Sequence, residues 1–194
     1  MLQFFKKHWL KFLLGAGFIT AAWFIYKRTI SMNTSENGLK FIMTEEGHQN
    51  KAYKDKYGKW TIGVGHLIKP NEQYLLTKIL TDAEVMALLR QDIKEAEDTV
   101  NASILIPIKQ YQFDALVSLE FNIGRHAFET STLHNVINGL GSKEEITKWF
   151  SAWNSHGLLK NRRAKEDKLY LTGDYSEHEF TLTASEMAQY YKAA

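Results

Sequence analysis

A short stretch of this chain combines two carboxylates and a threonine that could carry acid–base chemistry. Glu46 directly precedes Gly47, Asp55 follows Glu46 after nine positions, and Thr61 follows Asp55 after six. Cleavage of a bond between two sugars requires a pair of carboxyl groups that flank the bond. One of them donates a proton to the leaving sugar, and the other activates water or attacks directly. The spacing is therefore suited to glycosidic cleavage if the fold places these groups across a cleft.

The segment from Glu46 to His66 resembles the catalytic segment of the phage-type lysozymes, the endolysins that cut bacterial peptidoglycan. Three later motifs also resemble this family, and the likeness extends over nearly all of residues 35–175. These motifs are Phe121-Asn122-Ile123-Gly124, Ser131-Thr132-Leu133 and His156-Gly157-Leu158 followed by Asn161-Arg162-Arg163. The resemblance implies an α+β, lysozyme-like fold, in which a small mixed lobe with a β-hairpin packs against a larger helical lobe.

The resemblance assigns roles to five residues of this sequence. It implies that Glu46 is the general acid, and that Asp55 orients the attacking water with the help of Thr61. Hydrolysis would then invert the configuration of the sugar. Asn122 would line the glycan cleft, and Arg162, which we prefer to Arg163, would lie near the catalytic glutamate.

Simpler interpretations exist for several of these residues. An aspartate at a turn is common, and a threonine suits any strand. Glu45, next to the proposed acid, is expected to be a solvated surface residue. His66 is expected to be structural, and no pair of histidines has the spacing of a metal site, so we expect neither a metal nor a cofactor. Gly63 and Gly65 lack the following Gly-Lys-Ser/Thr of a phosphate loop.

Two alternative functions remain open at this point. A lytic transglycosylase needs the glutamate but no attacking water, and Asp55 with Thr61 argues against it. A catalytically silent, membrane-anchored glycan-binding protein would not need these residues at all. Peptidoglycan is the expected partner in each case.

The first 30 residues have the character of a membrane segment. Residues 12–26 carry no charge, and five basic residues flank them: Lys6, Lys7, Lys11, Lys27 and Arg28. Fifteen helical residues span roughly 22 Å, short of a ~30 Å hydrocarbon core, although residues 9–26 come closer. The segment could be a cleaved signal peptide, a permanent anchor in the inner membrane or a weak anchor that leaves the bilayer. We favour the last, with the enzyme facing the periplasm and becoming periplasmic after release.

The remaining residues, 31–194, are expected to form the catalytic domain. The composition, 44% hydrophobic and 13% aromatic, is that of a folded protein. Removing the five N-terminal charges from the 24 basic residues leaves 19 against 22 acidic ones, a net charge of −3. This balance argues against a nucleic-acid partner, which would need a basic face. The chain has no cysteine, and we expect a monomer.

Local patterns predict the elements that position the site. A helix ends at Glu46 because Gly47 has the character of a helix-ending residue. Residues 51–54 and 60–64 form a hairpin, and residues 66–74 form a loop. The chain from Thr81 onward is helical, with a capping box at its start, an apolar helix over residues 110–122, and further helices that begin after Ser131 and Ser142.

Overall fold

The computed structural model describes residues 31–176 and 183–193. The chain divides into two units, Met1–Met32 and Asn33–Ala194. The segment predicted to enter the membrane, residues 1–30, lies outside the described residues. Within the part that the structure describes, no helix combines the length and the hydropathy that a membrane span requires.

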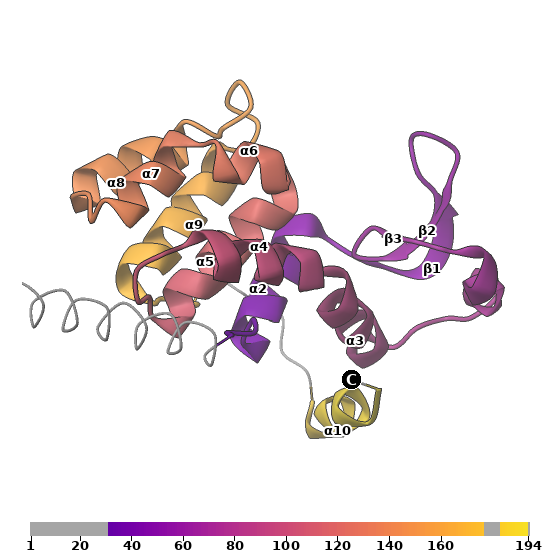
Figure 1. The fold of residues 1–194 in the computed structure, drawn as a ribbon. Helices are drawn as coiled ribbons and strands as arrows, with labels where there is room; N and C mark the ends of the chain where they lie inside the picture. Colours follow the sequence, from indigo (N-terminus) through magenta and orange to yellow (C-terminus); the bar gives the residue numbers. More distant parts are fainter. Residues whose placement is uncertain (1–30, 177–182, 194) are drawn as a thin grey trace, which may run out of the picture. The chain divides into compact units, whose positions relative to one another are not determined.

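The second unit contains a small sheet and a larger set of helices (Figure 1). In chain order its elements are α2 (Glu36–Glu46), β1 (Gln49–Lys54), β2 (Trp60–Gly63), β3 (His66–Leu67), the 3-10 helix η1 (Pro70–Leu76), α3 (Asp82–Asp92), α4 (Lys94–Ser103), α5 (Gln110–Ile123), α6 (Arg125–Glu129), α7 (Thr132–Asn138), α8 (Lys143–Ser151), α9 (Lys160–Thr172) and α10 (Ala184–Ala193). This arrangement confirms the predicted α+β class.

The sheet has three antiparallel strands in the order β1-β2-β3. The first two form the predicted hairpin, which turns at Asp55 and Gly58, where the Gly58 N–H donates to the Asp55 carbonyl at 2.9 Å. The prediction of a loop over residues 66–74 was wrong, because this region contains β3 and η1. The two residues of β3 pair with Thr61 and Ile62, and so short a strand leaves no periodic pattern in the sequence.

Helix α5 lies at the centre of the helical part. Its residues from Phe113 to Glu120 are all buried, and it packs against α2, α4 and α9. The predicted end at Gly124, the cap at Ser131 and the capping boxes at Thr81 and Ser142 are all confirmed. The helical pattern after Thr81 is realised by two helices, α3 and α4, which meet at the buried Ile93.

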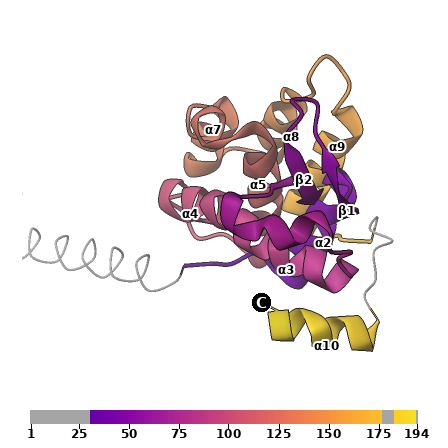
Figure 2. The ribbon, with the colours of Figure 1, turned by 90° about the vertical axis from the view of Figure 1, so that its right-hand side faces the viewer.

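Helix α10 lies along α3, as Figures 1 and 2 both show. Tyr190 is buried there, and its hydroxyl accepts a hydrogen bond from Arg90 Nε at 3.0 Å. Arg90 also donates to the carbonyl of Thr34 at 2.5 Å. The C-terminal helix is thus joined to the residues that precede α2, a contact that no sequence motif indicated.

Candidate active site

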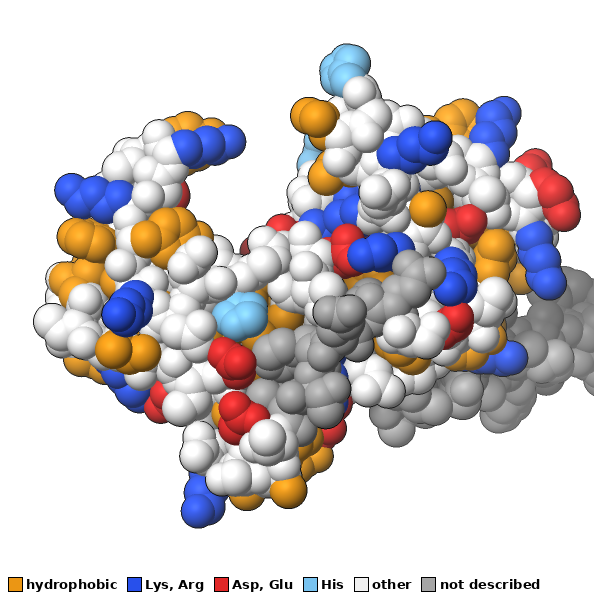
Figure 3. Space-filling view, turned by 180° about the vertical axis from the view of Figure 1, so that it is seen from behind, with side chains coloured by type: hydrophobic (Ala, Val, Ile, Leu, Met, Phe, Trp, Pro, Cys, Tyr) orange, Lys and Arg blue, Asp and Glu red, His pale blue; other side chains and the backbone are white. Residues whose placement is uncertain are grey.

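Glu46 is the last residue of α2 and borders a cavity between this helix and the sheet. The helix begins after Ser35, whose hydroxyl accepts from the Gly38 N–H, and it ends at Gly47, which has φ +69°. That left-handed conformation favours glycine and turns the chain directly into β1. The cavity, of about 440 Å³, is lined by Glu46, Gly47, His48, Gln49, Tyr53, Gly63, Val64 and Gly65. Figure 3 shows the surface hollowed between the hairpin and the helices.

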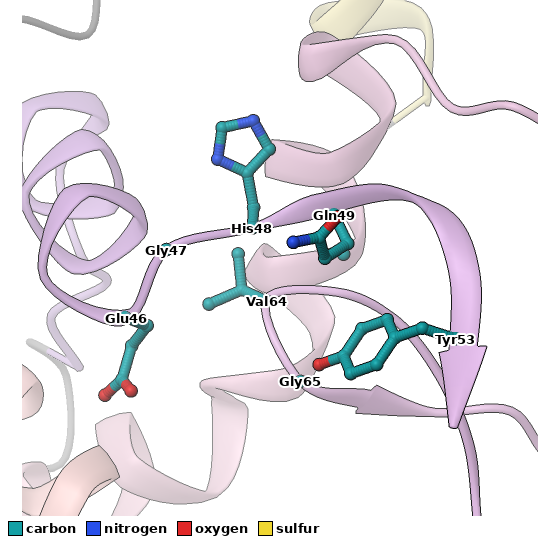
Figure 4. A pocket seen from close by; sticks show the side chains of 8 residues that line it. Glu46, Gly47, His48, Gln49, Tyr53, Val64 and Gly65 are labelled. Carbon is teal, nitrogen blue, oxygen red and sulfur yellow. The ribbon is translucent and has the colours of Figure 1, made fainter. Parts of the chain in front are cut away.

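The side chains around the cavity differ in direction (Figure 4). The carboxylate of Glu46 and the hydroxyl of Tyr53 come from opposite sides, and the turn at Val64 and Gly65 lies between them. His48 points away from both. Its ring lies 3.3 Å from Asp82, at the start of α3. A substrate in this cavity would therefore meet one carboxyl group, one phenol, the side chains of Gln49 and Val64, and backbone groups.

Arg162 holds the carboxylate of Glu46 from the helical side. Its Nη1 lies 2.6 Å from Glu46 Oε1, and its side chain is buried. Its Nη2 donates to the carbonyl of Ser118 on α5 at 3.1 Å. Burial alone would lower the pKa of Arg162, but Glu166 and Glu46 raise it above its usual value. The guanidinium therefore stays charged and fixes one oxygen of Glu46.

Asp55 and Thr61 lie on the hairpin, on the other side of the cavity from α2. Asp55 Oδ1 accepts from the backbone N–H groups of Tyr57 and Lys59, both at 2.8 Å. Oδ2 has no hydrogen-bond partner among the described residues. Thr61 pairs with Tyr53 across the strands, so both side chains lie on the same face of the sheet. Since Tyr53 lines the cavity, this is the face that borders it.

The structure brings some of the predicted residues into contact and leaves others separate. Arg162 contacts Glu46, whereas Asp55 and Thr61 do not line the cavity that contains Glu46. Asn122 lies at the end of α5, where its Oδ1 accepts from Arg163. That contact fixes the orientation of the amide and leaves its nitrogen available to another group.

The similarity of the chain to known proteins agrees with this geometry. The profile of the phage lysozyme family matches residues 43–166. The chain belongs to the phage lysozyme family. An endolysin of Acyrthosiphon pisum secondary endosymbiont phage 1 is 38% identical over 144 residues, which cover 70% of this chain and 96% of the relative. A SAR-endolysin of Haemophilus phage HP1 (strain HP1c1) is 31% identical over 186 residues, which cover 86% and 98%. The crystal structure of a P22 lysozyme mutant has a TM-score of 0.68 and 34% identity, and covers 73% of this chain and 99% of its own.

Membership in this family makes the chain a muramidase-type glycoside hydrolase that acts on peptidoglycan. The lysozyme-like fold predicted from the sequence is confirmed by the solved structures that it resembles. Among the residues that the structure describes, no group of three or more side chains could hold a metal ion.

The prediction that Glu45 is a solvated surface residue was wrong. Its side chain is only 8% exposed, and its carboxylate lies 2.8 Å from Lys165 Nζ on α9. Glu45 therefore forms a partly buried ion pair between α2 and α9 instead of a solvated surface charge. The partner lies 120 positions away in the sequence, and no local pattern could have revealed it.

His66 is the first residue of β3, and its imidazole pairs with two carboxylates. Its Nδ1 is 2.8 Å from Asp92 Oδ1, and its Nε2 is 3.0 Å from Glu72 Oε2. The hydrogen bond to Asp92, with that to Glu72, raises the pKa of His66 although burial opposes this. Two carboxylates require two N–H donors, which only the protonated imidazole has. The expectation of a structural histidine agrees with this geometry.

Sequence reasoning missed the buried carboxylate beneath Arg162. Glu166 lies one helical turn after Arg162 on α9, and Arg162 Nε donates to its Oε1 at 3.0 Å. A glutamate four positions from an arginine on a helix is a recognisable pairing signal. That signal does not reveal burial, because the same spacing also occurs on solvated helix faces.

Proposed function

We propose that this enzyme hydrolyses the β-1,4 bond between N-acetylmuramic acid and N-acetylglucosamine in peptidoglycan, with inversion at the anomeric carbon, to lyse the host cell. One observation carries the proposal: Glu46 ends α2 at the edge of the cavity, held by Arg162, with the Asp55 hairpin on the other side. A carboxyl group on each side of a sugar chain is what glycosidic cleavage requires.

In this reaction Glu46 gives its proton to the glycosidic oxygen of N-acetylglucosamine as the bond to the anomeric carbon breaks. A water molecule attacks the same carbon from the opposite face, and its proton passes to Asp55. The free Oδ2 of Asp55 suits this role, because Oδ1 is already occupied by two backbone N–H groups. Thr61 would help to hold the water, since it shares the cavity face of the sheet with Tyr53.

The alternatives make different products. A lytic transglycosylase would close the muramic acid ring on itself and would have no use for the water held by Asp55. A silent glycan-binding protein would release no sugar ends. A retaining enzyme would place its carboxyl groups about 5–5.5 Å apart, compared with about 6.5–9.5 Å for inversion. The ordered turn that presents Asp55 favours the water-dependent reaction.

Residues 9–26 and the similarity to SAR-endolysins support a proposal for where the enzyme acts. We propose that this segment holds the enzyme on the inner membrane, facing the periplasm, and that release from the bilayer yields a periplasmic lytic enzyme. The segment contains Gly15, Gly17 and several alanines, so its insertion is weakly favourable and leaving the bilayer costs little.

Digestion of purified peptidoglycan in water enriched in oxygen-18 tests the reaction. The proposal expects one labelled oxygen at each new reducing end, that end to be N-acetylmuramic acid, and early NMR spectra to show the α anomer. A 1,6-anhydro product without label would indicate a transglycosylase, and a β product would indicate retention. Release of neither reducing ends nor 1,6-anhydro ends would leave only the binding function.

A further inference from the structure

Glu166 is a fully buried carboxylate with three hydrogen-bond donors around it. Its Oε1 accepts from Arg162 Nε at 3.0 Å and from the hydroxyl of Ser118 at 2.8 Å. Its Oε2 accepts from Arg163 Nη1. Burial raises the pKa of Glu166, and the two guanidinium groups limit that rise. Because every neighbour donates and none needs a proton from it, the contacts are those of an ionised carboxylate.

These contacts determine where Arg162 can lie. Its Nε is held by Glu166, its Nη2 by the carbonyl of Ser118, and its remaining nitrogen, Nη1, contacts Glu46. The planar guanidinium has a rigid geometry, so fixing two nitrogens fixes the third. Glu166 therefore positions the arginine that contacts the catalytic acid, although it does not itself touch the cavity.

Glu166 also offsets positive charge close to Glu46. Arg162 and Arg163 bring two positive charges from α9, and Glu166 brings one negative charge between them. The other charged groups near Glu46 are already paired: Glu45 with Lys165, and His48 with Asp82. From the sheet, Tyr53 lines the cavity, and Asp55 lies at the turn of the hairpin.

We propose that Glu166 is a positioning residue for the catalytic acid, which aligns Arg162 against Glu46 and offsets the positive charge of Arg163. This inference rests on the proposed function, in which Glu46 is the general acid. Two uncompensated arginines would favour the ionised form of Glu46, which has no proton to donate. One buried carboxylate reduces the net charge of the cluster from +2 to +1.

The test is the pH dependence of kcat/KM for peptidoglycan hydrolysis by the full chain, measured in three variants. Glu166→Gln raises the cluster charge to +2, Arg163→Met lowers it to 0, and the double variant restores +1. One full charge within ~10 Å changes a proton equilibrium by about one pH unit. The alkaline limb should thus move about one unit down in Glu166→Gln, about one unit up in Arg163→Met, and stay near the wild type in the double variant.

The deciding quantity is the pH at which kcat/KM falls on the alkaline limb. The maximal value of kcat/KM does not enter the comparison. A merely structural role of Glu166 would lower activity equally at every pH, and the alkaline limbs of all variants would then fall at the same pH. That result would overturn the proposal. A limb that moves to higher pH in Glu166→Gln would also overturn it. Asp167→Asn is the matched control, because Asp167 lies next on the same helix and bonds to Thr147 on α8. It should move the limb less than Glu166→Gln does, because the Asp167 carboxylate bonds to Thr147 and does not align Arg162.

Two further comparisons keep the outcome clear. If Glu166→Gln does not fold, the two remaining variants still decide. The proposal expects the alkaline limb to move up in Arg163→Met and to match that of the wild type in the double variant. If Glu46→Gln keeps full activity, the proposed function fails. If Glu46→Gln is inactive and the limbs do not move, only the role of Glu166 fails.

Discussion

Replacing His66 with glutamine should destabilise this protein most strongly in mildly acidic solution. The imidazole bonds to Asp92 at 2.8 Å and to Glu72 at 3.0 Å. Hydrogen bonds to charged groups contribute about 1.5–3 kcal/mol each. The side chains of Asp92 and Glu72 are 22% and 20% exposed, so water can partly replace the lost partner. We therefore expect a total loss of about 2–3 kcal/mol, or a fall of ~4–12 °C in Tm.

The direction of the pH dependence follows from the raised pKa of His66. A histidine whose pKa is higher in the folded state stabilises the fold fully below its unfolded value of about 6.5, and this contribution disappears as the pH rises through the folded value. Partial burial would raise the pKa of Glu72, but the Lys69 N–H and His66 together hold it below its usual value. That contribution is present above the unfolded pKa of about 4.3 and is lost as the pH falls through the lowered one.

Thermal unfolding between pH 5.5 and 9.5 measures this effect. The difference in Tm between the wild type and His66→Gln should be largest at pH 5.5 and should shrink as the pH rises. His126→Gln is the matched control, since His126 is exposed on α6, and it should change Tm little at any pH. A difference that is constant across the range, or that grows with pH, would refute the assignment of a charged His66.

Three other variants test the position of α2 and the role of the N-terminal segment. Gly47→Ala places a side chain at φ +69° and ψ 168°, which costs about 1–3 kcal/mol; it should lower lytic activity more than Tm because the strain falls next to Glu46. Asp114→Asn disturbs a buried carboxylate that accepts from the N–H and the hydroxyl of Ser35, and calorimetry should show a loss of about 2–3 kcal/mol. A variant with three leucines in the N-terminal segment should remain in the membrane fraction and delay lysis, and normal timing would contradict release; its changed residues are Gly15, Gly17 and Ala21.

Local rules predicted the elements that carry the site. The glycine after Glu46 located the end of α2, because only a residue that tolerates positive φ turns the chain there. The pairs Thr81 with Glu84 and Ser142 with Glu145 located helix starts, because each forms a capping box within four residues. Such signals depend on neighbours in the sequence, so the sequence alone is sufficient.

Contacts between distant residues could not be predicted in the same way. Glu45 has its partner on α9, and Glu166 bonds to Ser118 on α5. A carboxylate looks the same in the sequence whether it is solvated or paired in the interior, and only packing separates the two. The third strand, His66–Leu67, was not predicted for a related reason, since it exists only through its pairing with β2.

The most direct test of the proposed mechanism compares two neighbouring glutamates in a turbidity assay on purified cell walls. Glu46→Gln keeps the size of the side chain and an acceptor for Arg162, but it has no proton to transfer. Its lytic rate should fall by ~10²–10⁴-fold, the usual contribution of general acid catalysis. Glu45→Gln weakens the pair with Lys165 and should cost some thermal stability while keeping lytic activity close to that of the wild type. Equal loss in the two variants, or loss in Glu45→Gln alone, would contradict the assignment of Glu46 as the acid.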